Sequence, residues 1–206
     1  MTLAPYRTKM RDSMVAIASR IVREEGLAAV QARRISQEAG CAVGTLYNVF
    51  GGLDFLIIEA NAQTLATLGE ALAKADAQVA SGTIGDRLLA LAIAYLRFAN
   101  DHDKAWRAVF EHHMVPGTEV PTWYRERQGG LFALIESILG KVMPDPIARG
   151  SAARALFSAV HGIVAISLDH KLGDFDLAEA ERQVQFVVKS VADGLVGAGR
   201  SDTNRA

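Results

Sequence analysis

QARRISQEAGCAVGTLYNVF, residues 31–50, is the stretch that decides the fold of this chain. Ala32, Ile35 and Ala39 recur at helical spacing and predict a short helix with one buried face. Gly40 then ends that helix and turns the chain, because a residue without a Cβ atom adopts the left-handed conformation at little cost. A second short helix follows the turn, so the stretch predicts a helix-turn-helix.

The second helix is predicted to have two faces of different chemistry. Its apolar face, expected to be buried, holds Val43, Leu46, Val49 and Phe50. Its other face is uncharged and holds Gly44, Thr45, Tyr47 and Asn48. Hydroxyl groups can donate to phosphate oxygens, an amide can pair with a base edge, and a glycine permits close approach of the backbone. These groups are typical of a recognition helix in the major groove of DNA.

The same residues resemble the TetR family of one-component transcriptional regulators. The resemblance is carried by Ile35-Ser36-Gln37-Glu38-Ala39-Gly40, by Gly44-Thr45-Leu46-Tyr47 and by Phe50, and it extends over residues 10–58. It implies an all-α protein with an N-terminal three-helix DNA-binding head and a C-terminal helical body for ligand binding and dimerisation. The boundaries predicted are residues 1–52 for the head and 53–200 for the body. The residues predicted to contact DNA are Arg33, Gly44, Thr45, Tyr47 and Asn48.

The chain departs from the family pattern in and around the motif. Val30-Gln31 stands where the family usually has Ser or Thr, and Ala42-Val43 stands where it usually has Ser-Lys. Gly51-Gly52-Leu53-Asp54 replaces the common Pro-Ser-Lys-Glu. Two phosphate-contacting lysines are therefore absent, at positions 43 and 53. Each absence is expected to weaken DNA binding and to flatten its salt dependence.

Composition and charge agree with a cytoplasmic regulator. Half of the 206 residues are hydrophobic, which suits a helical protein with an ample core. Residues 1–50 hold seven Lys and Arg against four Asp and Glu, whereas the remainder holds 15 against 19, so a basic head precedes an acidic body. The single Cys41 cannot form an intramolecular disulfide; it is a small filler in the turn or, alternatively, a redox sensor. No signal peptide is recognised and apolar runs are interrupted before 18 residues, so no membrane partner is expected.

The body is predicted to bind a small-molecule effector. Aromatic residues and a few polar groups are concentrated between positions 95 and 161, as in the wall of a pocket for an apolar or planar ligand. The candidates are Tyr95, Trp106, Phe110, His113, Trp123, Phe132 and His161. His161-Gly162 also resembles a signature that ends in His-Gly on the penultimate helix of some TetR-like ligand domains; there a tryptophan precedes it, and here Phe157 does. Any one of these side chains alone is better explained as part of an ordinary core, so the prediction rests on the group.

The last two predicted helices carry a seam of small and apolar residues that suits a two-fold interface. Such residues let another helix approach closely, and a palindromic operator requires a two-fold protein. The predicted seam contains Ser151, Ala155, Ala159, Gly162, Ile166, Val187 and Val191. The interior of a monomeric bundle would give the same pattern.

The sequence therefore predicts a ligand-responsive transcriptional regulator, most simply a repressor, that binds a palindromic operator in double-stranded DNA as a homodimer. The alternative is a helical small-molecule-binding protein whose DNA binding is weakened or lost. An enzyme is disfavoured because no nucleophile, base or phosphate loop stands in a catalytic arrangement. No cofactor or metal is expected, since His102, His112 and His113 lack further ligands at suitable spacing. Residues 1–9, with Arg7 and Lys9, are predicted to be a flexible arm, either solvated or touching DNA.

Overall fold

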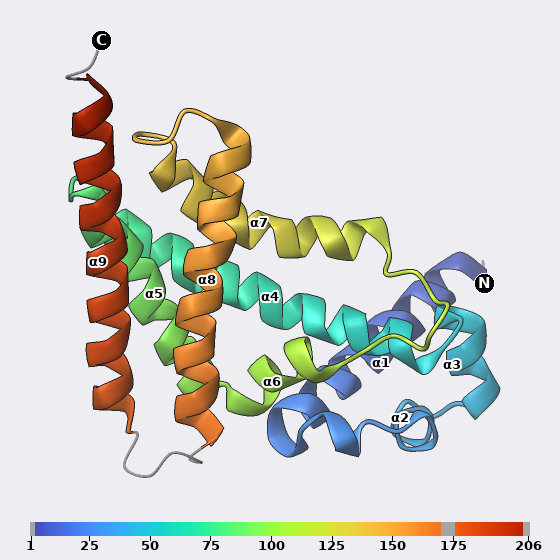
Figure 1. Cartoon of the computed structure of the whole chain (residues 1–206). Helices are drawn as coiled ribbons and strands as arrows, with labels where there is room; N and C mark the ends of the chain where they lie inside the picture. Colours follow the sequence, from blue (N-terminus) through green and yellow to red (C-terminus); the bar gives the residue numbers. More distant parts are fainter. Residues whose placement is uncertain (1–2, 170–175, 204–206) are drawn as a thin grey trace. The chain divides into compact units, whose positions relative to one another are not determined.

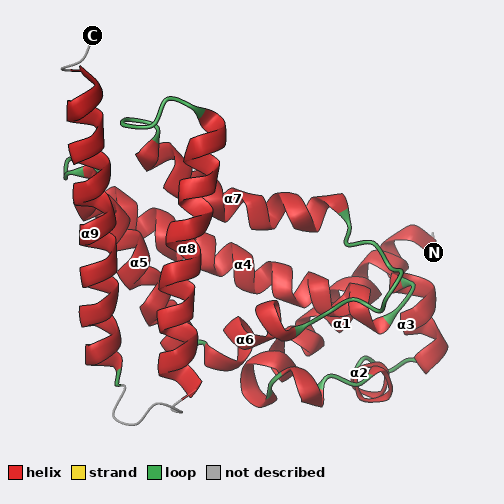
Figure 2. Ribbon diagram, viewed as in Figure 1, coloured by secondary structure: helices red, strands yellow, loops and turns green. Residues whose placement is uncertain are grey.

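The computed structural model describes residues 3–169 and 176–203 of the chain. Every regular element in these described residues is helical, which confirms the all-α prediction (Figure 2). Figure 1 follows the elements in chain order. They are α1 (Leu3–Glu25), the short 3₁₀ helix η1 (Leu27–Ala29), α2 (Ala32–Glu38), α3 (Val43–Phe50), α4 (Leu53–Gln78), α5 (Ile84–Asp101), α6 (Asp103–Glu111), α7 (Thr122–Leu139), α8 (Pro146–Asp169) and α9 (Leu177–Thr203).

The chain divides into two compact units. The first, here called the head unit, comprises Met1–Thr67 and His102–Arg127. The second, the body unit, comprises Leu68–Asp101 and Gln128–Ala206. By packing, the head unit therefore contains α6 and the first half of α4 in addition to the helix-turn-helix. The functional boundary between residues 52 and 53 stays a prediction.

The head unit is organised around one apolar core. Met14 and Ile21 of α1, Ile35 of α2, Leu46 of α3 and Leu56 of α4 are all fully buried and belong to one cluster. Each lies on the apolar stripe of its own helix, so the hydrophobic periodicity sets how the helices pack. The helix-turn-helix is thereby fixed against both α1 and the start of α4.

Glycines end the helices of the head unit, as the sequence predicts for Gly40. Gly26, Gly40 and Gly51 all have positive φ, at 91°, 70° and 83°. Gly51 is the left-handed C-cap of α3, and its N–H donates to the carbonyl of Tyr47. The chain then bends by 69° into α4. Because a side chain at positive φ is strained, these turns depend on glycine.

The N-terminal arm was predicted wrongly. Residues 3–9 are helical and extend α1 back to Leu3, whereas Met1 and Thr2 lie outside the described residues. Arg7 also contacts the helix-turn-helix, since its guanidinium donates to the carbonyl of Asn48 over 2.8 Å. The last helix, α9, continues through the Gly-Ala-Gly run at 197–199 to Thr203.

In the body unit α5 packs against α8 and α9, and α8 packs against α9. Two of these helices begin with side-chain caps. Thr83 and Asp86 form a reciprocal box at the start of α5, with Thr83 N–H donating to Asp86 and Asp86 N–H donating to Thr83. Asp176 accepts from the N–H of Glu179 over 2.7 Å at the start of α9. These caps satisfy amide groups that have no partner within the helix.

One helix of the body unit corrects the expectation that apolar runs are too short for a membrane span. By length and composition α8 could cross a bilayer, and the bent pair of α3 and α4 would be a second such span if taken together. A core or interface helix of a soluble protein meets the same test, so this is weak evidence for a membrane. Only 28% of the apolar window of α8 is buried within the chain. The helix therefore leaves an apolar face uncovered.

Candidate nucleic-acid interface and ligand-binding residues

The outer face of α3 is the first candidate site. Leu46 and Phe50 anchor α3 in the core of the head unit, and this anchoring turns the predicted polar face outward. Tyr47 is 51% exposed, Gly44 and Asn48 are exposed, and Thr45 is half-buried. A Cβ atom added at Gly44 would meet nothing within 4 Å. Packing within the chain therefore does not require glycine there.

Val43 does not take the place that the periodicity predicts. It was expected on the buried face of α3, but it is 36% exposed. Val43 is the first residue of α3, and the buried residues of that helix, Leu46 and Phe50, come later in it, so helical phase alone does not bury Val43. An apolar side chain therefore stands on the surface at a position where the resembled family has a lysine.

Cations near α3 fall into two groups. Arg34 is held in a network with Glu25 and Glu38, and Arg20 pairs with Glu38 as well. Hydrogen bonds from Arg34 hold the pKa values of Glu25 and Glu38 below their usual range, and the same bonds raise the pKa of Arg34. Arg33 is exposed and has no such partner among the described residues. It is therefore the arginine of α2 available to a phosphate.

Two arginines of α1 also contact α3. The sequence did not predict these contacts. Arg7 donates to the carbonyl of Asn48, in the last turn of α3. The Arg11 guanidinium lies 5.0 Å from the ring centroid of Phe50 and also pairs with Glu59 of α4. Both contacts are long-range in sequence, so no local pattern could have indicated them. Together they hold α3 between α1 and α4.

The predicted ligand-binding residues lie in both units. In the head unit Trp106 is buried, and its ring centroid lies 5.1 Å from that of Phe110 on α6. Trp123 lies 5.6 Å from Tyr124 on α7, measured between ring centroids. His113 Nδ1 donates to the carbonyl of Glu111 over 2.8 Å. These residues belong to one packing unit, and their contact with a ligand stays a prediction.

In the body unit the structure brings three predicted residues together. The hydroxyl of Tyr95 lies 2.8 Å from Nδ1 of His161, and the rings of Phe132 and His161 both contact Phe157. Burial lowers the pKa of His161 below its usual value and so favours the neutral imidazole. Phe157 was not predicted as a site residue, although its spacing four residues before His161 on α8 is a usable signal.

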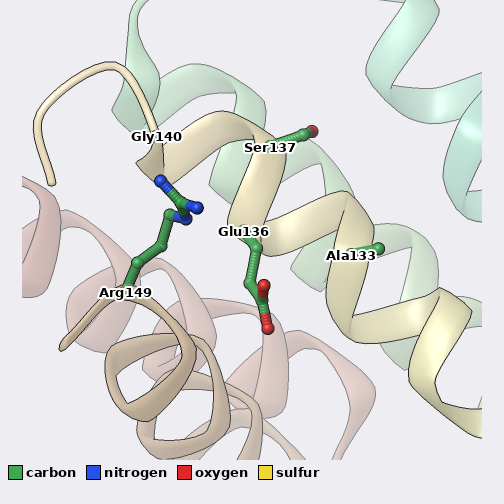
Figure 3. A pocket seen from close by; sticks show the side chains of 5 residues that line it. All are labelled: Ala133, Glu136, Ser137, Gly140 and Arg149. Atoms are coloured by element: carbon green, nitrogen blue, oxygen red, sulfur yellow. The ribbon is translucent and has the colours of Figure 1, made fainter. Parts of the chain in front are cut away.

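A shallow hollow lies where α7 ends and α8 begins (Figure 3). It encloses about 300 Å³ and is lined by Ala133, Glu136, Ser137, Gly140 and Arg149. Glu136 and Arg149 come from facing elements, and the guanidinium of Arg149 donates to the carbonyl of Met143. None of these five residues was predicted as a site residue.

The predicted dimerisation seam is largely uncovered within one chain. On α8, Ser151, Ala155, Ala159 and Ile166 are exposed, and a Cβ atom added at Gly162 would meet nothing within 4 Å. On α9, Val191 is exposed and Val187 is half-buried. The buried stripe of α8 is separate and consists of Gly150, Ala153, Leu156, Val160, Val164 and Ser167. Phe186 of α9, which is 73% exposed, was missed.

Solved structures share this architecture. A protein of unknown function from Rhodococcus sp. RHA1 has a TM-score of 0.68 at 20% identity, covering 90% of this chain and 93% of that chain. A TetR-family transcriptional regulator from Streptomyces coelicolor has a TM-score of 0.61 at 17% identity, covering 98% and 89%. A TetR transcriptional regulator from Rhodococcus sp. RHA1 has a TM-score of 0.62 at 17% identity, covering 89% and 96%. At such identities the likeness shows the fold alone.

The all-helical architecture, with a helix-turn-helix near its N-terminus, defines the class of helix-turn-helix transcriptional regulators. A family model described as "Tetracyclin repressor-like, C-terminal domain" matches residues 88–198, more than half of the chain. The chain therefore belongs to the TetR family. No curated protein matches it by sequence. At the level of the family it is a regulator rather than an enzyme.

Proposed function

We propose that this protein is a ligand-responsive repressor that binds a palindromic operator through α3. The observation that carries the proposal is the outer face of α3. It presents Tyr47, Asn48 and Gly44 to solvent without any charged side chain, while Leu46 and Phe50 fix the helix from behind. Hydroxyl and amide groups on a rigid helix can bond phosphates and base edges, and Gly44 allows the backbone to come close. Thr45 completes this set.

Phosphate neutralisation in this proposal comes from arginine. Arg33 is exposed and unpaired among the described residues, and it lies on the helix that precedes the recognition helix. A contact between Arg33 and a phosphate would place α2 across the DNA backbone. Arg34 is unsuited to that role because Glu25 and Glu38 already hold it.

Two copies would pair through α8 and α9. Their exposed faces carry the small residues of the predicted seam together with Ile166, Val191 and Phe186. An apolar face of this kind is stabilised by a second copy, and a two-fold dimer matches an inverted repeat. The partners proposed are therefore operator DNA, a second copy of the chain and a small-molecule effector, in the cytoplasm.

Repression would be relieved by a population shift. An effector that binds one conformation better than another can change operator affinity only by that difference in its own affinity. The proposed effector contacts are the aromatic and histidine side chains of the two units, namely Tyr95, Trp106, Phe110, His113, Trp123, Phe132 and His161.

The alternative is a ligand-binding protein whose DNA binding is weak. The observation in its favour is the exposed Val43, which stands where the family places a lysine. A salt-dependent titration of the full chain against fragments of its own genome, starting with the DNA that flanks its gene, separates the two. Saturable binding to one inverted repeat that weakens steeply with salt supports the repressor. Weak and equal binding to every fragment supports the alternative.

A further inference from the structure

The first turn of α3 carries an apolar surface that the core of the head unit does not use. Val43 opens the helix and is 36% exposed, and its neighbours Ala42 and Gly44 are exposed as well. The core takes Leu46 and Phe50 from this helix and does not include Val43. A lone exposed valine is ordinary on most surfaces, but this one lies on the helix that is proposed to meet DNA.

Val43 shares one face of α3 with the polar groups of the proposed DNA-binding surface. Residues four apart lie one above the other on a helix, so Val43 lies one turn before Tyr47, and Gly44 lies one turn before Asn48. All four residues are exposed, and Tyr47 is 51% exposed. They therefore form one continuous outer strip, in which the apolar group comes first and the polar groups follow.

The side chains at the N-terminal end of α3 can contact a base only through apolar groups. In a helix-turn-helix, this end of the recognition helix is the part that contacts base edges in the major groove. Here it holds Ala42, Val43 and Gly44, which have no charge and no side-chain hydrogen-bonding group. A donor or acceptor of a base covered by Val43 would lose its water without a replacement. The 5-methyl group of thymine is the apolar feature of the major groove, so it is the base feature that fits this end of α3.

We propose that Val43 is a specificity-determining residue whose side chain packs against the 5-methyl group of a thymine in each half-site of the operator. This inference rests on the proposed operator binding and names a base that the operator must contain. Val43 then has a role of its own at the position where the resembled family has a lysine. It selects a base, whereas a lysine contact to phosphate would strengthen binding to any sequence.

An operator selected by the full chain from a random duplex library supplies the probe for this contact. Each thymine of one half-site is replaced in turn by deoxyuridine, which lacks the 5-methyl group and keeps every base pair. At one thymine the affinity is expected to fall about fourfold, the worth of one buried methyl group. The loss should be the same at low and high salt, since an apolar contact neutralises no phosphate.

Val43→Ala assigns this loss to the valine. The change shortens an exposed side chain in the first turn of α3, and alanine is the better helix former, so the variant should fold. It is expected to bind the thymine and deoxyuridine duplexes alike at the position where the wild type distinguishes them. Val115→Ala is the matched control, because Val115 is 60% exposed and lies between α6 and α7, outside the helix-turn-helix. This control should keep the fourfold preference.

The outcomes separate this inference from the proposed function. A selected operator at which no deoxyuridine weakens wild-type binding would overturn the role of Val43 and leave the repressor standing. A preference for thymine that survives in the folded Val43→Ala variant would also overturn it, because the methyl group would then act through the shape of the DNA. If the library yields no preferred sequence, the contact and the operator proposal fail together.

Discussion

Tyr47 is the residue of α3 at which DNA binding and folding can be separated most cleanly. Its side chain is half exposed, whereas its neighbour Leu46 is fully buried. Tyr47→Phe removes one hydroxyl and leaves the ring in place. We expect operator binding to weaken by about 1 kcal/mol, the usual worth of one hydrogen bond. The free energy of unfolding should stay the same, since the hydroxyl bonds nothing within the described chain.

Parallel operator titrations and urea unfolding of the two proteins measure both quantities. Unchanged affinity would remove Tyr47 from the contact surface. A loss of both affinity and stability would instead assign the hydroxyl to the fold.

Gly44→Ala should move stability and DNA binding in opposite directions. A Cβ atom at this position meets nothing within 4 Å, and alanine favours a helix over glycine by up to about 1 kcal/mol. The variant is therefore expected to unfold at higher urea concentration. If the backbone of α3 approaches DNA at Gly44, the added methyl group should lower operator affinity.

Gly129→Ala is a matched control for that change. Gly129 is also helical, and its added Cβ atom also meets nothing within 4 Å, but it lies on α7 in the body unit. It should raise stability and leave operator affinity unchanged. Equal operator affinity of the Gly44 variant and the wild type would show that the DNA backbone does not come close at this position.

At the scale of helices, the sequence predicts what depends on local spacing and misses what depends on contacts across the chain. Leu46 and Phe50 are buried as the period of 3.6 requires, and Gly40 and Gly51 turn the chain where a positive φ is needed. The prediction that Val43 is buried was wrong. Helical phase gives the side of the helix on which a residue lies, but it does not say whether the neighbouring helices extend far enough to cover the first turn. The bond between Arg7 and Asn48 spans 41 residues, so no local pattern could have indicated it.

The same limit applies to the candidate ligand residues. Tyr95 and His161 meet although they are 66 residues apart. Composition indicated that both belong to one group of ring side chains, but only the packing of α5 and α8 shows that Phe157 contacts both of them. Trp106 and Trp123, by contrast, belong to the head unit, a division that spacing along the chain does not reveal.

The pair of Asp76 and Arg87 should make the stability of the body unit depend on pH. It joins the end of α4 to α5 through two bonds of 2.7 Å, and both side chains are largely buried. Arg87 lowers the pKa of Asp76 below its value in the unfolded chain. The resulting stability is therefore present above the unfolded pKa, near 3.8, and is lost as the pH falls below it through the folded pKa. Asp76→Asn should cost about 1 kcal/mol at pH 7 and less at pH 3.

Circular dichroism in urea at the two pH values measures this difference. Tryptophan fluorescence would report the wrong unit, because Trp106 and Trp123 both lie in the head unit. Asp103→Asn is the control, since the Asp103 side chain is 41% exposed in its pair with Arg107, compared with 18% for Asp76. An equal cost in the two variants would show that burial does not strengthen the Asp76 pair.

For the whole molecule, the uncovered face of α8 and α9 connects stability with function. Within one chain α8 buries one stripe and leaves the opposite stripe of small and apolar residues in solvent. The operator proposal needs two recognition helices at a fixed separation, which one chain cannot supply. The same face would thus explain both the exposed apolar surface and the two-fold recognition of DNA.

Ile166→Asp and Phe186→Asp should therefore dissociate the proposed dimer. Each change places an unpaired carboxylate twice in an apolar interface, and a buried charge without a partner costs about 3 kcal/mol or more. The dimer dissociation constant is expected to rise more than a hundredfold, as measured by sedimentation equilibrium, and operator affinity should fall with it. Gln185→Asp, a change at a neighbouring exposed position of α9, should alter neither. If the two variants remain dimeric, the two copies pair through another face, and the exposed stripe of α8 must be covered by something else.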